Sequence, residues 1–574
     1  MNKMTKRMRF RFSHWRSLGF LCFVSVGVLA RAEQRNVCLL PLASEEPGRP
    51  TSSPFYPDAL YGVEDVGWSA YMRVWQEHQK DPSNLDVRRF LGLPTEEPFV
   101  FQAKRGRSSP RWLEWRPGTF AQVDTSHFTI FSTADELTSR RVAEDLEHCY
   151  WVWTQLFFPL WEGSAQVTTA FADWDPDQSL VEFLATRRPR LSIRRQMQVV
   201  LLKDKEQYRR TLAAEGNAIE QSTGFYSDSL RTIFLYGIDD DAVETRRHEL
   251  THQLFREATR SSLGQAMPGE QSDFWLVEGI AGYMESMKIG ERQATIGGWD
   301  ASRLQYARYR VLVGQDLMLP DELMRDGLQQ AQRRDDLARW YSHSIANVHA
   351  LMDGGDVTIR RWLYHRLSSL YRSRSPLAPL ANQDSIESQL MQSWGRGLQQ
   401  YLYLDDAKLE GSPPSTPVRV LCLSGCEITE DALGLVPASS GMTWLDLAGL
   451  PVGNAAVQRL VPDPSSLEQL TLEVTKVDDG MGAWLQKATG LRELDMSWTK
   501  VGDSFLQELS GFQDLSVLWM TGTRLTDQSI DAIIRLPKLE SLDVQRTQIS
   551  DAGLERIRKA RPSLQVNPLE LRSP

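Results

Sequence analysis

Alternating apolar and polar positions between residues 119 and 404 predict a mixed sheet followed by a helical half. Period-2 alternation indicates strands, and apolar residues that recur every three to four positions indicate helices. Strands are expected at 127–132 and 197–202, helices at 136–157 and 205–214, and a hairpin at 223–237. Because strands alternate with helices before the helical stretch begins, we expect a domain of the α+β class over residues 119–408.

A second pattern repeats every 24 or 25 residues near the end of the chain. Copies of L-x-x-L-x-L, each followed by a turn and an apolar helical stretch, begin at Val418, Met442, Leu467, Leu491, Leu515 and Leu539, and a truncated copy begins at Leu564. The unit and its period resemble leucine-rich repeats. The resemblance implies an α/β leucine-rich-repeat solenoid over residues 418–566, after a Pro/Ser linker at 409–417.

The repeat register predicts which side chains face inward. The repeated leucines fill the core, and the column that contains Thr475 and Thr499 turns the chain after each strand. A further strand column is expected to face outward, and it comprises Cys422, Asp446, Thr471, Asp495, Trp519 and Asp543. A face of carboxylates and indoles either binds a protein partner or is an ordinary solvated surface, and we keep both interpretations.

The first 32 residues differ from the rest of the chain. Six Lys and Arg residues precede an apolar run over 18–30, which ends at the small-x-small sequence Ala30-Arg31-Ala32. This order is typical of a secretory signal peptide, and the run is shorter than an ordinary membrane span of ~20 residues. We therefore expect a secreted, periplasmic or cell-surface protein with no stable membrane span after cleavage. Retention of the segment as an anchor is the alternative.

The charge of the chain argues against nucleic acid as its main partner. The whole chain carries −9, and loss of residues 1–32 removes seven Lys/Arg and no Asp/Glu, which leaves −16. Five cysteines are too few for a disulfide framework in 574 residues, although a Cys38–Cys149 bridge is possible in an oxidising compartment. Residues 33–118 are expected to form a poorly defined N-terminal extension that packs on the domain after it.

The segment 244–255 (ETRRHELTHQLF) carries the candidate chemistry. Residues 242–258 contain no Gly or Pro and follow three aspartates, so a helix is expected there. His248 and His252 then project from one helical face, one turn apart, where two imidazoles can share a tetrahedral metal ion. Glu249 is turned about 100° from His248 around the helix, so it can act on a water beside the metal without being a ligand.

A third ligand is needed, because a catalytic zinc usually has three protein ligands. The metzincin position, six residues after the second histidine, is Ala258, which excludes that class. The stretch 273–286 (DFWLVEGIAGYMES) is compatible with a helix and contains Glu278. H-E-x-x-H followed by W-L-x-E-G-x-A-x-Y resembles the gluzincins, which are zinc metallopeptidases with two His and one Glu as ligands.

The chain is most similar to a family of secreted bacterial gluzincin-like proteins, over roughly residues 112–404. The shared motifs are W-R-P-G at 115–118, T-S-H-F at 125–128 and R-H-E-L-T-H-Q-L-F at 247–255. The resemblance implies a zincin-like fold with Zn²⁺ held by His248, His252 and Glu278, and with Glu249 as general base. It also implies that residues 231–237 form the sheet edge along which an extended peptide substrate lies.

Two positions near the third ligand depart from the thermolysin pattern or stay open. That group has an acidic residue four after the ligand Glu, where this chain has Gly282. Glu285, on the same helical face as Glu278, either supports the metal site or is a surface glutamate, and we favour the surface interpretation. The helical stretch 339–352 contains Tyr341 and His343 as candidate oxyanion donors; Tyr341 is preferred, and helix packing is the alternative.

Two functions follow from these expectations. The first is a secreted zinc metallopeptidase, a hydrolase that cleaves peptide or protein substrates, whose repeats bind the substrate or a protein partner. The alternative is a non-catalytic secreted binding protein whose repeats mediate protein–protein interaction and whose zinc domain is silent. A purely structural zinc would leave Glu249 without a role and would favour Cys ligands, none of which lies near the motif.

Overall fold

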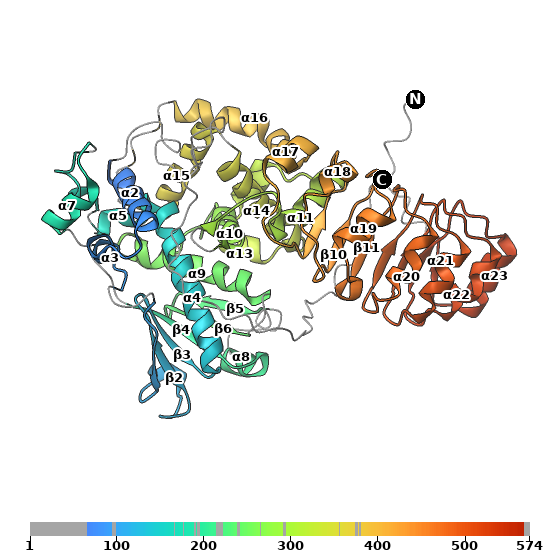
Figure 1. Cartoon of the computed structure of the whole chain (residues 1–574), viewed down its shortest axis with the longest axis horizontal. Helices are drawn as coiled ribbons and strands as arrows, with labels where there is room; N and C mark the ends of the chain where they lie inside the picture. The colour runs from blue at the N-terminus through green and yellow to red at the C-terminus, as the bar shows by residue number, and fades with distance from the viewer. Residues whose placement is uncertain are drawn as a thin grey trace. The chain divides into compact units, whose positions relative to one another are not determined.

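The computed structural model describes residues 66–567, apart from 95–98, 166, 176, 189–190, 192–195, 214–221, 238–240, 265, 291–293, 355, 374–376, 378–379 and 381. The expected signal segment 1–32 and Cys38 lie outside the described residues. The chain divides into two compact units (Figure 1). The sheet unit contains the described residues up to 297 and 320–394, and the repeat unit contains 298–319 and 395–567.

A six-stranded mixed sheet forms the centre of the sheet unit. Its strands are β1 (Gln102–Arg105), β2 (Ala121–Asp124), β3 (Phe128–Ser132), β4 (Met197–Leu202), β5 (Gly224–Ser227) and β6 (Thr232–Tyr236). They are arranged in the order β1-β2-β3-β4-β6-β5. The β3–β4 and β4–β6 pairs are parallel and the others antiparallel. The expected strands and hairpin are therefore confirmed, and β1, from the expected extension 33–118, belongs to the same sheet.

Alternating side chains of the central strands cover both faces of this sheet. Phe131, Val200 and Phe234 point to one face, where they pack with Phe120 and Tyr208. The neighbouring residues in sequence point to the other face, as period-2 geometry requires, and are equally buried. Burial on both faces explains why β4 reads as the continuous apolar run VVLL at 199–202.

Helices make up the rest of the sheet unit. They are α2 (Val66–Lys80), α3 (Leu85–Leu91), α4 (Glu136–Leu156), α5 (Phe158–Ala165), α6 (Val167–Ala170), α7 (Leu180–Arg187), α8 (Lys205–Thr211), α9 (Asp241–Leu263), α10 (Phe274–Glu285), α12 (Pro320–Arg325), α13 (Leu328–Gln332), α14 (Leu337–Asp353) and α15 (Val357–Leu370). A short hairpin, β7 (Lys288–Ile289) with β8 (Ala294–Thr295), follows α10. Helix α16 (Gln383–Leu402) contributes residues to both units. The helices expected at 136–157, 242–258, 273–286 and 339–352 are confirmed as α4, α9, α10 and α14.

The described part of the N-terminal extension is anchored by aromatic packing. The Trp68 ring lies 5.9 Å from that of Phe158, and its indole N–H donates to the Gln155 carbonyl. The Tyr71 hydroxyl donates to Thr154 Oγ1 at 2.8 Å. The prediction that this extension packs on the domain after it is therefore confirmed for α2, which is joined to α4 and α5.

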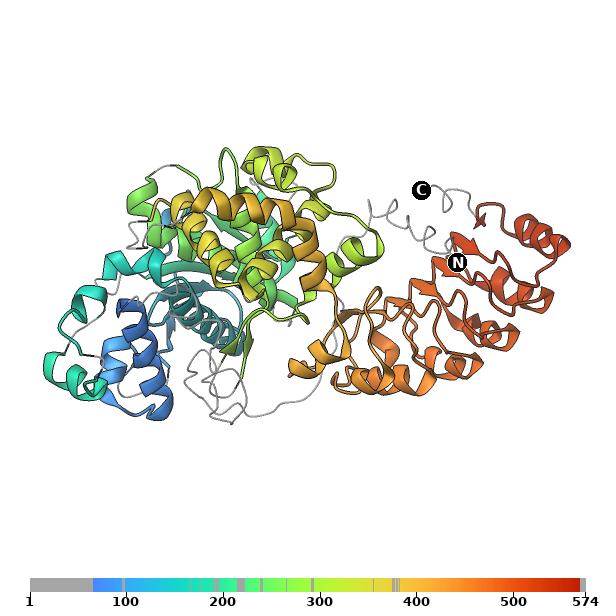
Figure 2. The same cartoon turned by 90° about the horizontal axis from the view of Figure 1, so that it is seen from above.

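The repeat unit is built on seven parallel strands in sequential order. They are β9 (Val420–Cys422), β10 (Trp444–Asp446), β11 (Gln469–Thr471), β12 (Glu493–Asp495), β13 (Val517–Trp519), β14 (Ser541–Asp543) and β15 (Gln565–Val566). Equivalent repeat positions pair across each step, as Leu445 does with Leu470. Short helices follow the strands: α18 (Glu430–Leu433), α19 (Asn454–Leu460), α20 (Gly482–Leu485), α21 (Asp503–Glu508), α22 (Ile530–Arg535) and α23 (Asp551–Ala560). They line one side of the strands (Figure 2).

The threonine column turns the chain as expected. The hydroxyls of Thr475, Thr499 and Thr523 each donate to the carbonyl three residues earlier, at 2.6–2.7 Å. This bond closes the turn after the strand. The leucines of each repeat form one continuous buried core, so the predicted inward positions are confirmed.

An unexpected cap covers the open edge of β9 inside the repeat unit. Helix α11 (Ser302–Arg308) and the π-helical turn Tyr309–Val313 come from residues assigned by sequence to 119–408. The buried Arg308 guanidinium donates to the Cys422 carbonyl at 3.0 Å, and the Cys422 N–H donates to Gln305 Oε1 at 3.1 Å. Side chains thus satisfy the backbone of the first strand, which otherwise has no neighbour on that side.

Candidate metal centre

Helix α9 presents its motif residues between the sheet and α10. Gln253 ties this helix to the sheet, because its amide donates to the backbone carbonyls of Gln198 and Arg231, both at 3.1 Å. The apolar residues Leu250 and Leu254 are buried on the same helix. With that face fixed, His248 and His252 lie on the side of α9 from which Glu278 of α10 approaches.

Two glycines allow α10 to approach α14 closely. A Cβ atom on Gly279 would lie 2.5 Å from Val348 Cγ2, and one on Gly282 would lie 2.4 Å from Ile345 Cγ1. Gly282 is the position at which the chain departs from the thermolysin pattern. The departure has a packing reason, since any larger side chain there would push the helix that carries Glu278 away from α14.

The three expected metal ligands converge. Nε2 of His248 lies 3.2 Å from Glu278 Oε2, and Nε2 of His252 lies 3.8 Å from Glu278 Oε1. One donor atom from each residue lies within 4.8 Å of the other two. Among the described residues, no other set of three His, Cys, Asp or Glu side chains has this geometry. The donor set of two imidazoles and one carboxylate, drawn from two helices, matches that of a catalytic zinc site.

Glu285 supports this cluster, and the surface interpretation we favoured from the sequence is wrong. The residue is only 4% exposed, and its Oε1 lies 2.8 Å from Nδ1 of His248. Seven residues make two helical turns, so Glu285 and Glu278 project from the same face of α10. A carboxylate on Nδ1 fixes the orientation of the imidazole and leaves Nε2 as the atom that faces Glu278.

Burial and neighbouring charge set the protonation of the site. Burial lowers the pKa of His252 to about 4 and raises the pKa of Glu249 to about 7. Burial also acts to lower the pKa of His248, but hydrogen bonds to Glu278 and Glu285 outweigh it and raise the value to about 10. Burial acts to raise the pKa of Glu278, and the two histidines hold it below its usual range. Buried imidazoles and carboxylates thus lie together at this site, and hydrogen bonds and opposite charges set their protonation.

Glu249 is held apart from the ligand cluster by the edge of the sheet. Its Oε2 accepts a hydrogen bond from the backbone N–H of Tyr226 in β5, at 2.8 Å. The expectation that residues 231–237 form the sheet edge is wrong, because β6 lies between β4 and β5. The second strand of the hairpin is interior, and the first, β5, is the edge that faces Glu249.

Two tyrosines differ in their relation to the cluster. Tyr341 lies on α14, where its ring packs edge-on against Trp340 at 5.4 Å, and Trp340 in turn stacks on Phe274 at the start of α10. Tyr371, which belongs to no motif in the sequence, is buried and stacks on Phe255 at 4.8 Å. Burial, and then the negative charge of Glu278, raise the pKa of Tyr371, so its hydroxyl stays protonated.

A buried ion-pair network holds the start of α9 against α4. Asp145 accepts from Nε of Arg246 at 2.8 Å and from Nη2 of Arg247 at 2.7 Å. The Arg247 guanidinium also donates to the Met287 carbonyl, just after α10. Because Arg247 precedes His248 directly, this network positions both helices that supply the ligands. Only the three-dimensional structure links Asp145, about one hundred residues away, to the motif.

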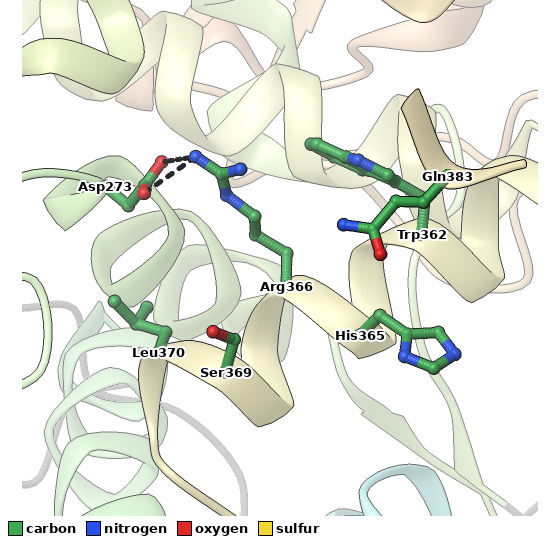
Figure 3. Close-up of a pocket in the computed structure, with 7 residues that line it drawn as sticks. All are labelled: Asp273, Trp362, His365, Arg366, Ser369, Leu370 and Gln383. Atoms are coloured by element: carbon green, nitrogen blue, oxygen red, sulfur yellow. Dashed lines mark hydrogen bonds and ion pairs between the residues drawn. The ribbon is translucent and has the colours of Figure 1, made fainter. Parts of the chain in front are cut away.

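A separate cavity of about 510 Å³ lies at the start of α10 (Figure 3). The Arg366 guanidinium reaches across it to the Asp273 carboxylate, at 2.9 and 3.0 Å. Trp362 and Gln383 line the same cavity. Its central cation is thus already paired, and the cavity does not include the His248–His252–Glu278 cluster.

The strand column expected to face outward is largely buried. Asp446 and Asp495 are 1% exposed, Asp543 is 6% exposed and Cys422 is fully buried, so the prediction is wrong for these four residues. Each carboxylate bends back and accepts the backbone N–H two residues later, as Asp446 does from Ala448 at 3.0 Å and Asp495 from Ser497 at 2.9 Å. Short aspartate side chains favour such turns, which remove them from the surface.

Comparison with known proteins identifies the repeat class and no more. Residues 535–557 match the leucine-rich-repeat family model. A solved leucine-rich-repeat protein of Leptospira interrogans is 18% identical with a TM-score of 0.18, over 26% of this chain and 48% of that protein. The chain therefore spans about half the length of that relative. No curated protein matches the chain in sequence.

The fold and the repeat match define a mixed α/β protein that carries leucine-rich repeats. Such repeats are modules for protein–protein interaction. The described residues contain no helix that combines the length and the apolar character needed to cross a bilayer.

Proposed function

We propose that this chain is a zinc-dependent peptidase whose leucine-rich repeats bind its substrate or a protein partner. The observation that carries the proposal is the convergence of His248, His252 and Glu278, with Glu249 beside them on a separate hydrogen bond. Two imidazoles and one carboxylate leave a tetrahedral zinc ion with one open corner, which is the arrangement of catalytic rather than structural sites.

Each residue of the cluster has a defined task in this proposal. His248, His252 and Glu278 would hold the zinc, which when bound supplies Lewis acidity for the scissile carbonyl and for water. Glu285 holds the His248 ring in the orientation that ligation needs. Glu249 takes a proton from the attacking water and returns it to the leaving amine, which is the task of a general base that then acts as a general acid.

The substrate would bind along β5. An edge strand offers unpaired backbone groups to an extended peptide, which adds to the sheet as a further strand. The Tyr226 N–H points from this edge to Glu249, so a peptide bond held against β5 would lie beside the general base. Donors to the tetrahedral oxyanion are proposed among Tyr341 and Tyr371, and the burial that keeps the Tyr371 hydroxyl protonated favours the latter.

The alternative function is a secreted binding protein with a silent zinc domain. The match over 535–557 supports its interaction part, because leucine-rich repeats mediate protein–protein interaction, and that part is common to both functions. Secretion, proposed from residues 1–32, is common to both functions.

The test is zinc stoichiometry combined with digestion of a peptide library. We expect the purified protein to bind one zinc per chain and to hydrolyse peptides. Glu249→Gln should abolish hydrolysis and keep the zinc, whereas His248→Ala should lose both. Glu206→Gln, which changes an exposed glutamate of α8, serves as the matched control.

The outcomes separate the two functions. A protein that binds zinc and cleaves nothing supports the silent-domain alternative. A protein that binds no zinc overturns both interpretations of this site. Loss of zinc in Glu249→Gln to the same extent as in His248→Ala would mean that the ligand and base roles are misassigned.

A further inference from the structure

One residue after each of the six repeat strands β9 to β14 adopts a left-handed backbone conformation. In three repeats this residue is a glycine, namely Gly425, Gly449 and Gly522. In the other three it is Val474, Trp498 or Arg546, with φ angles of 56°, 58° and 56°. Positive φ is strained for residues with a Cβ atom, and most of all for β-branched residues such as valine. The three glycines show that the fold itself does not need side chains there.

These strained residues present an apolar surface at the ends of neighbouring strands. Val474 is 48% exposed and Trp498 is 45% exposed, and both belong to adjacent repeats. The N–H of Val474 donates to the Ser497 carbonyl at 2.9 Å, so the two turns lie side by side. Large apolar side chains that are exposed to water at strained backbone positions indicate a role other than core packing.

The indole of Trp498 is held flat by its neighbours. A Cβ atom on Gly522 would lie 2.5 Å from Cε3 of this ring, so the ring lies directly over that glycine. The Arg546 guanidinium carbon lies 5.5 Å from the ring centroid, in a cation–π contact. The contacts with Gly522 and Arg546 thus hold the indole in one orientation, and we call the Trp498 ring in this orientation the platform.

A row of three cations lies two residues further along the consecutive repeats that carry Val474, Trp498 and Gly522. Its exposed members are Lys476, Lys500 and Arg524. The equivalent positions in the other repeats are Glu427, Pro451 and Gln548. The carboxylate of Asp478, two residues after Lys476, accepts hydrogen bonds from the Asn454 amide at 2.6 Å and from the Gly480 N–H at 3.0 Å. The bond from Asn454, and then the positive charges of Lys500 and Arg524, hold the pKa of Asp478 below its usual range.

We propose that Val474, Trp498 and Arg546, with the row Lys476, Lys500 and Arg524, form the docking surface of the repeat unit, and that its partner is an acidic protein segment. Carboxylates of such a segment would pair with the row of cations, and one of its apolar side chains would pack on the Trp498 indole. The chain as a whole is acidic, with a net charge of −9. The basic row is therefore a local feature of the repeat unit and does not reflect the overall charge of the chain.

Side chains of the strand column offer a poorer docking surface. The carboxylates of Asp446 and Asp495 accept backbone hydrogen bonds within their own turns and are almost fully buried. The platform at the strand ends keeps its side chains available to a partner. This inference is independent of the proposed peptidase activity, because it uses no residue of the sheet unit.

The test is selection of random 16-residue peptides, displayed on phage, against the full-length protein. The Glu249→Gln form is used so that the result does not depend on whether peptides are cleaved. Parallel selections use the same protein with Trp498→Gly, Lys500→Glu or Lys487→Glu. The last is the matched control, since Lys487 is an exposed lysine of the repeat unit outside the row.

We expect enrichment of peptides rich in Asp and Glu that contain an aromatic or aliphatic residue. Their dissociation constants should rise at least about tenfold with Trp498→Gly and with Lys500→Glu, and should stay unchanged with Lys487→Glu. Trp498→Gly and Val474→Gly should unfold at the same temperature as the parent or higher, because glycine relieves the left-handed strain.

Several outcomes would overturn the proposal. Enrichment of basic peptides, no enrichment, or binding that survives Trp498→Gly would each do so. A lower unfolding temperature in both glycine variants would assign the column to folding rather than to docking. Binding of a labelled oligonucleotide that Lys500→Glu abolishes would replace the acidic segment with a nucleic acid.

Discussion

Oε1 of Glu285 lies 2.8 Å from Nδ1 of His248, although the two residues are 37 positions apart in the chain. The contact joins α9 to α10 at the point where both present candidate metal ligands. It gives His248 a defined tautomer in the presence of a metal, because Nδ1 carries the proton that Glu285 accepts and Nε2 is left as the ligand atom.

Replacement of Glu285 tests whether this contact supports metal binding. In Glu285→Gln the side chain keeps its shape but loses the charge that orients and polarises His248. We expect the affinity for zinc to fall about 10- to 100-fold, measured by competition with a chelator of known affinity. Glu206→Gln should leave it unchanged. Equal affinities in wild type and Glu285→Gln would show that the contact does not serve the metal.

We expect Tyr371 to matter more for catalysis than Tyr341. Tyr371→Phe removes a hydroxyl that burial keeps protonated, and loss of one oxyanion donor typically costs about 10²–10³ in kcat. Tyr341→Phe should change kcat by less than about threefold, since Tyr341 packs against Trp340. Steady-state kinetics on one peptide decide the matter. A reversed order of the two effects would restore the sequence-based preference for Tyr341.

Asp145 should be essential to the stability of the sheet unit. Asp145→Asn leaves the Arg246 and Arg247 guanidinium groups buried without a counter-charge, which we expect to cost about 3–5 kcal/mol in the free energy of unfolding. Urea denaturation measures it, and Glu144→Gln on the same helix, which is partly exposed, is the control. A change below about 1 kcal/mol would mean that water reaches the pair.

The ion pairs of Asp145 with Arg246 and Arg247 also predict how the stability of the sheet unit responds to acid. Burial acts to raise the pKa of Asp145, but the two arginines outweigh it and lower the pKa from 3.8 to about 2. A depressed folded-state pKa gives stability that is present above pH 3.8 and is lost as the pH falls towards 2. The wild-type protein should lose this contribution in that window, and Asp145→Asn should not.

The buried carboxyl group of Asp446 predicts the opposite dependence of stability on pH in the repeat unit. Burial raises its pKa from 3.8 to about 6, even though Ser424 and the Ala448 N–H donate to it. The folded state therefore binds the proton more tightly, and the stability it contributes is present below pH 3.8 and is lost as the pH rises through 6. Asp446→Asn, which keeps an acceptor without the charge, should stabilise the unit at pH 8.

The expected gain for Asp446→Asn at pH 8 is about 3 kcal/mol, since each pKa unit corresponds to ~1.4 kcal/mol. At pH 4 the two proteins should be equally stable. Thermal unfolding at the two pH values measures both. A gain that is the same at pH 4 and pH 8 would contradict a charge-based cause.

Local patterns were sufficient for the elements and for part of the site. The 24- to 25-residue period placed every repeat strand, because each repeat buries the same leucines against its neighbour and a shift of one residue would expose them. The spacing of His248 and His252 likewise determined that they share a helical face. Glu278 followed from resemblance, and the structure brings it within 3.2 Å of His248.

Tertiary structure alone decided the surroundings of these residues. The hydrogen bond between Glu285 and His248, the hydrogen bond from Tyr226 to Glu249 and the ion pair between Asp145 and Arg247 each join segments that are many residues apart. The assignment of residues 298–319 to the repeat unit has the same origin, since Arg308 reaches a carbonyl 114 positions away. Periodicity reports contacts within one or two turns of the chain, and it carries no information about which distant surfaces pack together.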